Sequence, residues 1–248
     1  MTQSYRMTLL MLRLTVAGCA TPGARPEDMS AAQHRRQADF ESGTAEKHQG
    51  QYEATRTTRE RCRGRIDAAR VGVDFYDICW SSVTNPTESH LGEAEKYRRR
   101  AADHRAAAAA LGETEERACS GVAPDDRDIS PFEHHEDIAA VEPLTERVGT
   151  GKVPVPRTTG VVVTFRAVPG LTTEWLQRVV DCHLARNVSL GHEMPEMPNC
   201  PLVPKGAEAR VSSTGNGFAV AIRSDDPISA AEILARATRL SHPPASTQ

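Results

Sequence analysis

The first half of the chain is polar, and its apolar positions are mostly alanines repeated at steps of three and four residues. The spacing is clearest after Asn85, where Pro86 suits a first helical turn and Glu88 completes a capping-box spacing. We therefore expect a long helix from Asn85 to Cys119 with one face made of small residues. That face consists of Ala94, Tyr97, Ala101, His104, Ala108, Leu111 and Ala118.

Two stretches upstream also have a helical composition, at 28–49, where Ser30 can cap, and at 53–71. Residues 72–86 break the helical pattern, and residues 122–147 look mostly irregular. Small residues let helices approach closely. We therefore expect the region 28–147 to be a helical domain, an Ala-rich antiparallel hairpin or bundle of two or three helices.

The second half of the chain is rich in valine and changes to the pattern of a mixed α and β module. β-Branched residues at both odd and even positions of 159–168 would lie on both faces of a strand, which predicts a central strand. Gly215-Asn216-Gly217 predicts a hairpin turn. The expected elements are a strand at 159–168, a helix from Thr172 to Leu190, strands at 207–214 and 218–224, and a helix from Asp226 to Leu240. The order β-α-β-β-α predicts a small sandwich over 159–241 with the helices on one face.

Proline and glycine at 148–158 predict a linker between the two parts. Residues 19–27 are expected to be a tether, and residues 242–248 a disordered tail. The predicted fold class is therefore α+β, with an N-terminal helical hairpin or bundle followed by the β-α-β-β-α sandwich.

Composition narrows the function classes. Aromatic residues are only 4% of the chain, which predicts a small or Ala-rich core. The formal net charge of −3 argues against a strongly basic nucleic-acid binder. No run of about 18 apolar residues is present that would span a bilayer. No nucleophile-elbow, P-loop or dinucleotide-binding motif is found, so no catalytic residue is predicted.

The first 18 residues have the layout of a secretory signal, with Arg6 before a short apolar stretch and small residues at its end. Val16-Ala17-Gly18-Cys19 resembles the lipobox of bacterial lipoproteins, and this resemblance implies lipidation of Cys19. Ala20 in place of an aspartate then favours the outer membrane. Arg13 lies inside the apolar stretch and departs from the pattern. The alternative is a cytoplasmic N-terminus in which this tetrapeptide occurs by chance.

The six cysteines suggest an oxidising compartment. With Cys19 lipidated, five remain, which predicts two disulfides and one further thiol. We expect Cys182 to pair with Cys200 across a loop. Cys62, Cys79 and Cys119 could pair in any combination, and Cys62 with Cys119 is favoured because both lie near the ends of helical stretches.

One loop could carry chemistry, because soft and borderline ligands are concentrated in it. His183, His192, Met194, Met197 and Cys200 are the donor types that suit Cu(I). The structural alternative is a Cys182–Cys200 disulfide with both methionines packed on the sheet. The spacing matches no strong metal signature, and the structural alternative is favoured.

Several segments resemble envelope proteins and lipoproteins of Gram-negative bacteria. They include NPTESH and AEKYRRRAADHRAAAAAL within 85–111, and VDCHLARN and MPNCPLV within 180–203. The resemblance covers most of the mature chain and implies a location and an architecture, with no established activity. We therefore expect a structural or binding lipoprotein on the periplasmic face of the outer membrane, held by its lipid anchor and contacting an envelope protein. The alternative is a periplasmic copper-binding protein.

Overall fold

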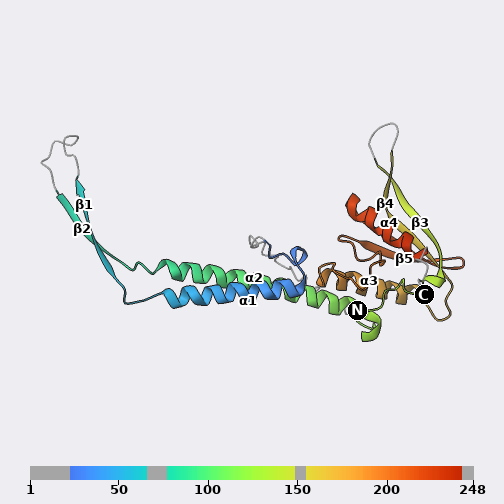
Figure 1. The fold of residues 1–248 in the computed structure, drawn as a ribbon, viewed down its shortest axis with the longest axis horizontal. Helices are drawn as coiled ribbons and strands as arrows, with labels where there is room; N and C mark the ends of the chain where they lie inside the picture. Colours follow the sequence, from blue (N-terminus) through green and yellow to red (C-terminus); the bar gives the residue numbers. More distant parts are fainter. Residues whose placement is uncertain (1–22, 66–76, 149–154, 242–248) are drawn as a thin grey trace, which may run out of the picture.

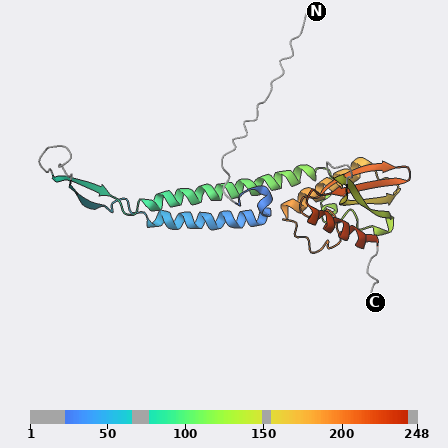
Figure 2. The same ribbon diagram turned by 90° about the horizontal axis from the view of Figure 1, so that it is seen from above.

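The computed structural model describes residues 23–65, 77–148 and 155–241, and side chains at 60–81 are outside the description. The described part contains four α-helices and two antiparallel sheets. Figures 1 and 2 show an extended molecule with two parts, which we call the arm and the head. The arm comprises two helices and a two-stranded ribbon at its far end. The head comprises the larger sheet and the other two helices. The predicted signal, Cys19 and tail lie outside the described residues.

The arm is built on helix α1 (Ala31–Gln51) and helix α2 (Ser89–Ala118), which lie side by side along its length (Figure 1). Ser30 begins α1 with a capping box, in which its hydroxyl accepts from the Gln33 amide and the Gln33 side chain accepts from the Ser30 amide. The contact face is mostly alanine. Ala38, Ala94 and Ala101 are almost fully buried there, which lets the two backbones approach closely.

The far end of the arm differs from the sequence expectation. The predicted helix at 53–71 is wrong, because strand β1 (Thr58–Arg65) pairs there with strand β2 (Asp77–Thr84) in an antiparallel ribbon. Arginine and glutamate in this segment gave a helical composition. β2 brings Ile78, Trp80 and Val83, which have high strand propensity. Pairing along the full length of both strands overrides the weaker helical preference of one of them.

The head has one four-stranded sheet with the order β3-β4-β6-β5, antiparallel throughout. Its strands are β3 (Ile138–Val148), β4 (Val155–Arg166), β5 (Glu208–Thr214) and β6 (Gly217–Arg223). Its helices are α3 (Thr173–Ser189) and α4 (Pro227–Ser241).

The presence of strand β3 shows that two sequence predictions are wrong. Residues 138–147 are not irregular, and 148–158 is not a linker between domains, because β3 and β4 pair on both sides of that segment from Ile138 to Phe165. Residues 149–154 themselves lie outside the described residues. β3 is an edge strand with Glu142, Pro143 and Glu146 in it, so it lacks the apolar alternation that would reveal it. The sheet therefore has four strands, one more than predicted.

One face of the sheet and both helices form the main core. Val161, Val163 and Phe165 alternate along β4 toward this core, and α4 supplies Ile233 and Ala237. Helix α3 contributes Leu176 and Val180 to the same cluster. β4 is internal in the sheet, which agrees with its run of β-branched residues.

A disulfide between Cys119 and Cys182 joins the end of α2 to α3, with 4.4 Å between the Cα atoms. The predicted pairs Cys182–Cys200 and Cys62–Cys119 are therefore wrong. Cys200 is a buried free thiol, and the side chain of Cys62 lies outside the described residues. The close approach depends on packing between the two parts of the molecule, where Val122 and Val179 complete a small apolar cluster. Distance along the sequence does not reveal that contact.

A salt bridge reinforces the same junction. Arg186 of α3 donates to Glu115 of α2 at 2.8 Å and also pairs with Asp128. Arm and head are therefore tied together by a covalent bond and by a partly buried ion pair within a few turns of α2 and α3.

Candidate functional site

The five predicted metal ligands have different surroundings. Met194, Met197 and Cys200 are buried in the main core of the head, as the structural alternative expected of the methionines. His192 follows Gly191 with a φ of 64°, and its Nδ1 lies 2.7 Å from the carbonyl oxygen of Val203. His183 is fully buried on α3. No group of three or more histidine, cysteine, aspartate or glutamate side chains in the described residues is arranged to hold a metal ion.

Burial shifts the pKa values of two of these side chains, Cys200 and His183. Burial raises the pKa of the Cys200 thiol, although a hydrogen bond from Ser130 opposes the shift, so this thiol stays protonated near neutral pH. Burial also lowers the pKa of His183, and the backbone of Asp126 and Ile129 acts in the opposite direction. His183 is therefore neutral near physiological pH, close to the backbone of the loop 126–129.

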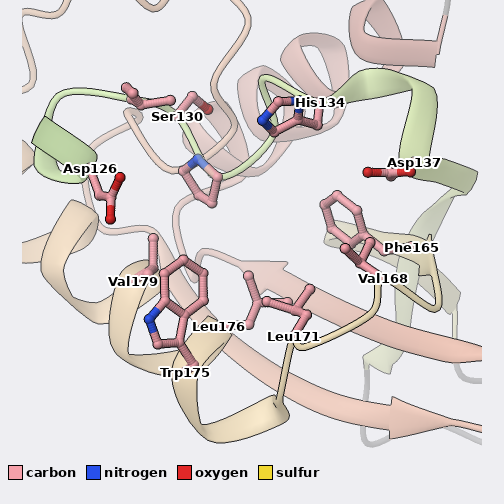
Figure 3. Close-up of a pocket in the computed structure, with 12 residues that line it drawn as sticks. Asp126, Ser130, His134, Asp137, Phe165, Val168, Leu171, Trp175, Leu176 and Val179 are labelled. Atoms are coloured by element: carbon pink, nitrogen blue, oxygen red, sulfur yellow. The ribbon is translucent and has the colours of Figure 1, made fainter. Parts of the chain in front are cut away.

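The loop 126–129 forms part of one wall of an apolar cavity in the described residues, with a volume of about 200 Å³. Helix α3 forms the facing wall, and the end of β4 with the turn after it closes one side (Figure 3). Local sequence places α3, because Thr172 caps it by accepting from the Trp175 amide at 3.2 Å. The cap sets Trp175 and Leu176 in the first turn, beside the cavity.

The lining of the cavity is apolar, with a few polar groups at the rim. Phe165, Leu171 and Leu176 contribute to the apolar lining, and Figure 3 shows Trp175 beside Leu176 and Val179. The remaining lining residues are Asp126, Ile129, Ser130, Pro131, His134, Asp137 and Val168.

Two large apolar side chains at this cavity are unusually exposed. Trp175 is 42% exposed and Ile129 is 45% exposed. Aromatic side chains exposed next to an apolar hollow are typical of recognition surfaces, where they become buried against a partner. The two rim carboxylates, Asp126 and Asp137, would complement a positive charge beside the apolar group that fills the cavity.

The sequence predictions missed this cavity. Trp175 was expected on a helix, but the loop that faces it was expected to be irregular and was given no role. A lone tryptophan in the first turn after a threonine cap was the available signal. It does not reveal which distant loop covers the neighbouring surface.

The sequence predictions also missed two histidine pairs in the arm. His34 Nδ1 lies 3.0 Å from His104 Nδ1, and His48 Nδ1 lies 3.1 Å from His90 Nδ1. The available signal was a shared spacing, since each helix has its two histidines 14 residues apart. Both pairs form between α1 and α2, so the spacing of histidines within one helix does not reveal them.

No helix in the described ranges is long and apolar enough to cross a membrane. Comparison with protein-family models, with curated proteins and with solved structures finds no match. The function has to be argued from the chain's own geometry.

Proposed function

We propose that this protein is a lipid-anchored binding module of the bacterial envelope. In this proposal the head holds a protein partner, and the arm, an Ala-rich helical hairpin, acts as a spacer. The observation that carries the proposal is the apolar cavity with Trp175 and Ile129 exposed at its rim. The sandwich-like head serves as the scaffold that fixes the cavity walls.

The chemistry of the cavity indicates what would fill it. About 200 Å³ is the size of one large apolar side chain and is small for a cofactor. Asp126 and Asp137 add negative charge at the rim. We therefore expect the partner to present an aromatic or branched aliphatic residue with a lysine or arginine close to it.

The envelope location rests on two independent features. The Cys119–Cys182 bond is of a kind that persists in oxidising compartments. Val16-Ala17-Gly18-Cys19 has the lipobox pattern, and a diacylglycerol on Cys19 with a further acyl chain would give stable anchoring. Together they favour the periplasmic face of the outer membrane.

Anchoring is tested by fractionating the native host with and without globomycin, which blocks cleavage of lipoprotein signals. We expect the native chain in the membrane fraction, an uncleaved precursor with globomycin, and release of a Cys19→Ala variant from the membrane. Native protein that is soluble and unshifted by globomycin would contradict the anchor.

Binding is tested by placing a photo-crosslinking amino acid at position 175 in cells. The matched control is position 228, because Ile228 is 79% exposed on α4 and does not line the cavity. We expect a discrete crosslinked protein from position 175 alone, reduced when Asp126→Lys and Asp137→Lys reverse the rim charge. Equal products at both positions, or no effect of charge reversal, would contradict the site.

A further inference from the structure

The contact face of the arm has a seven-residue repeat in which alanine alternates with a larger side chain, polar at every position except Leu111. Positions on each helix follow one another at steps of three and four, which is the spacing of a coiled-coil seam. On α1 the seam residues are Ala31, His34, Ala38, Glu41, Ala45 and His48. On α2 they are His90, Ala94, Tyr97, Ala101, His104, Ala108 and Leu111.

A single antiparallel register brings the polar seam residues together. His34 meets His104 and His48 meets His90, with ring centroids 5.3 and 5.4 Å apart. The first pair is the more enclosed, with His34 fully buried and His104 only 3% exposed. Polar layers in an otherwise apolar seam fix register at some cost in stability. Here the polar groups are imidazoles, each of which has one donor and one acceptor when neutral and two donors when protonated.

The contact between two Nδ1 atoms constrains the protonation state of the pair. One ring must donate a proton from Nδ1 and the other must accept it with a bare Nδ1. When both rings are imidazolium, both facing atoms are donors, and two positive charges lie side by side in a poorly solvated seam. Nε2 of His34 is also buried without a hydrogen-bond partner, so a proton added there gains no acceptor.

The surrounding charges do not remove this conflict. The pKa of His104 is lowered first by burial and then by His34, while Glu41 of α1 and Asp103 of α2 act in the opposite direction. Glu41 is itself 6% exposed, and one of its oxygens accepts from Gln37 at 3.0 Å. At the second pair, the ring of Tyr97 stacks on His48, and Lys96 and Arg100 lie over that tyrosine.

The geometry points to an acid-sensitive arm: we propose that double protonation of the His34–His104 pair, with His48–His90 contributing, separates α1 from α2 while the head stays folded. A histidine whose pKa is lower in the folded state stabilises that state above the unfolded value of 6.5. The stabilisation is lost as the pH falls below that value. The main core of the head consists of apolar side chains and the Cys200 thiol. The buried His183 of α3, whose pKa is also lowered by burial, gives the head a pH dependence of its own that does not involve the histidines of the arm.

The proposal is tested on the full chain carrying Cys19→Ser, so that the result does not depend on anchoring or on a partner. Hydrogen exchange, corrected for intrinsic rates, is compared at pH 7.5 and 5.0 with a chelator present. We expect protection of α1 and of the first half of α2 to fall about tenfold or more. Any loss of protection in β4 and β6, which His183 of α3 can cause, should be the same with and without the histidine pairs of the arm.

Two double variants test whether the loss of protection at low pH comes from the His34–His104 pair or from other acid-sensitive groups. His34→Ala with His104→Ala converts the layer to alanine, like its neighbours in the seam, and should remove most of the pH dependence. His34→Gln with His104→Gln keeps polar groups that do not titrate and gives the answer if the alanine variant is poorly folded at pH 7.5. The matched control, His134→Ala with His135→Ala, changes two exposed histidines of the head and should leave the drop intact. Equal arm protection at both pH values, or an undiminished drop in the glutamine variant, overturns the proposal.

Discussion

The arm and the head are stabilised in different ways. The head buries large apolar side chains completely, among them Phe132, Leu202, Ile222 and Ile233. The buried apolar positions along the seam of the arm are alanines, with Leu111 near its end. Burial free energy scales with apolar area, so each alanine contributes only a fraction of what a leucine or isoleucine does. The arm therefore depends more on close fit, on its polar pairs and on its junction with the head.

The same difference between head and arm explains why the binding cavity lies in the head and the protonation-sensitive contact lies in the arm. A tightly packed apolar core holds a cavity open because its walls cannot collapse, and α3 and β4 provide such walls for the pocket at Trp175. A contact face of small residues buries little apolar area, so it contributes little to the free energy of unfolding of the arm. Changes of protonation that a large core would tolerate can therefore alter the conformation of the arm.

The largest expected effect is the loss of a core side chain in the head. Ile233→Ala should lower the free energy of unfolding of the head by about 2–5 kcal/mol, because the side chain is fully buried and would leave a cavity. Urea unfolding followed by Trp175 fluorescence, in a Trp80→Phe background, measures it. Ile228→Ala, on the same helix but exposed, should have almost no effect, and equal costs for the two would contradict the assigned core.

The next effect concerns the junction of the two parts. Cys119→Ser with Cys182→Ser removes the disulfide and should cost about 2–4 kcal/mol. The loss should also increase hydrogen exchange in the last turns of α2, near Glu115. Peptide mapping without reduction checks the bond itself, and recovery of Cys182 linked to Cys200 would contradict the junction. Cys200→Ala is the control, because it removes a cysteine that forms no crosslink and should leave exchange in α2 unchanged.

Overfilling the arm should have a smaller effect that stays local. Ala101→Leu places a large side chain in the seam, where Ala101 is 1% exposed, and should cost about 1–3 kcal/mol. Exchange should rise in α1 and α2, with the head unaffected. Ala102→Leu, one position along and exposed, is the matched control and should be neutral. Equal effects of the two would mean that the seam is loosely packed.

Much of the head could be predicted from sequence because its signals are local. The start of α3 near Thr172, the turn at Gly215–Gly217 and the valines of β4 are each determined by nearby residues, and the structure has all three elements. Strand β3 could not be predicted this way. Its backbone pairs with β4 while its side chains are mixed, and only the partner strand stabilises it as a strand.

The features that depend on tertiary contact were the ones missed. Cys119 and Cys182 are 63 residues apart and meet only because α2 packs on α3. The histidine pairs likewise require the register between α1 and α2, which single-helix spacing does not provide. The cavity combines a loop, a strand end and a helix. Its residues were all visible in the sequence, but their proximity was not.

The smallest effect is expected from removing one helix N-cap in the arm and one in the head. Ser30 caps α1 by accepting from Gln33, and Thr172 caps α3 by accepting from Trp175, each at 3.2 Å. Ser30→Ala and Thr172→Ala should each cost about 1 kcal/mol. In the head this loss is spread over a cooperative core, whereas in the arm it should fray the first turn of α1 beside His34. Exchange at residues 31–35 should therefore rise more in Ser30→Ala than exchange at 173–177 rises in Thr172→Ala. An equal rise in exchange at both helix starts would show that the arm unfolds as cooperatively as the head. That result would contradict the lower stability expected of the arm.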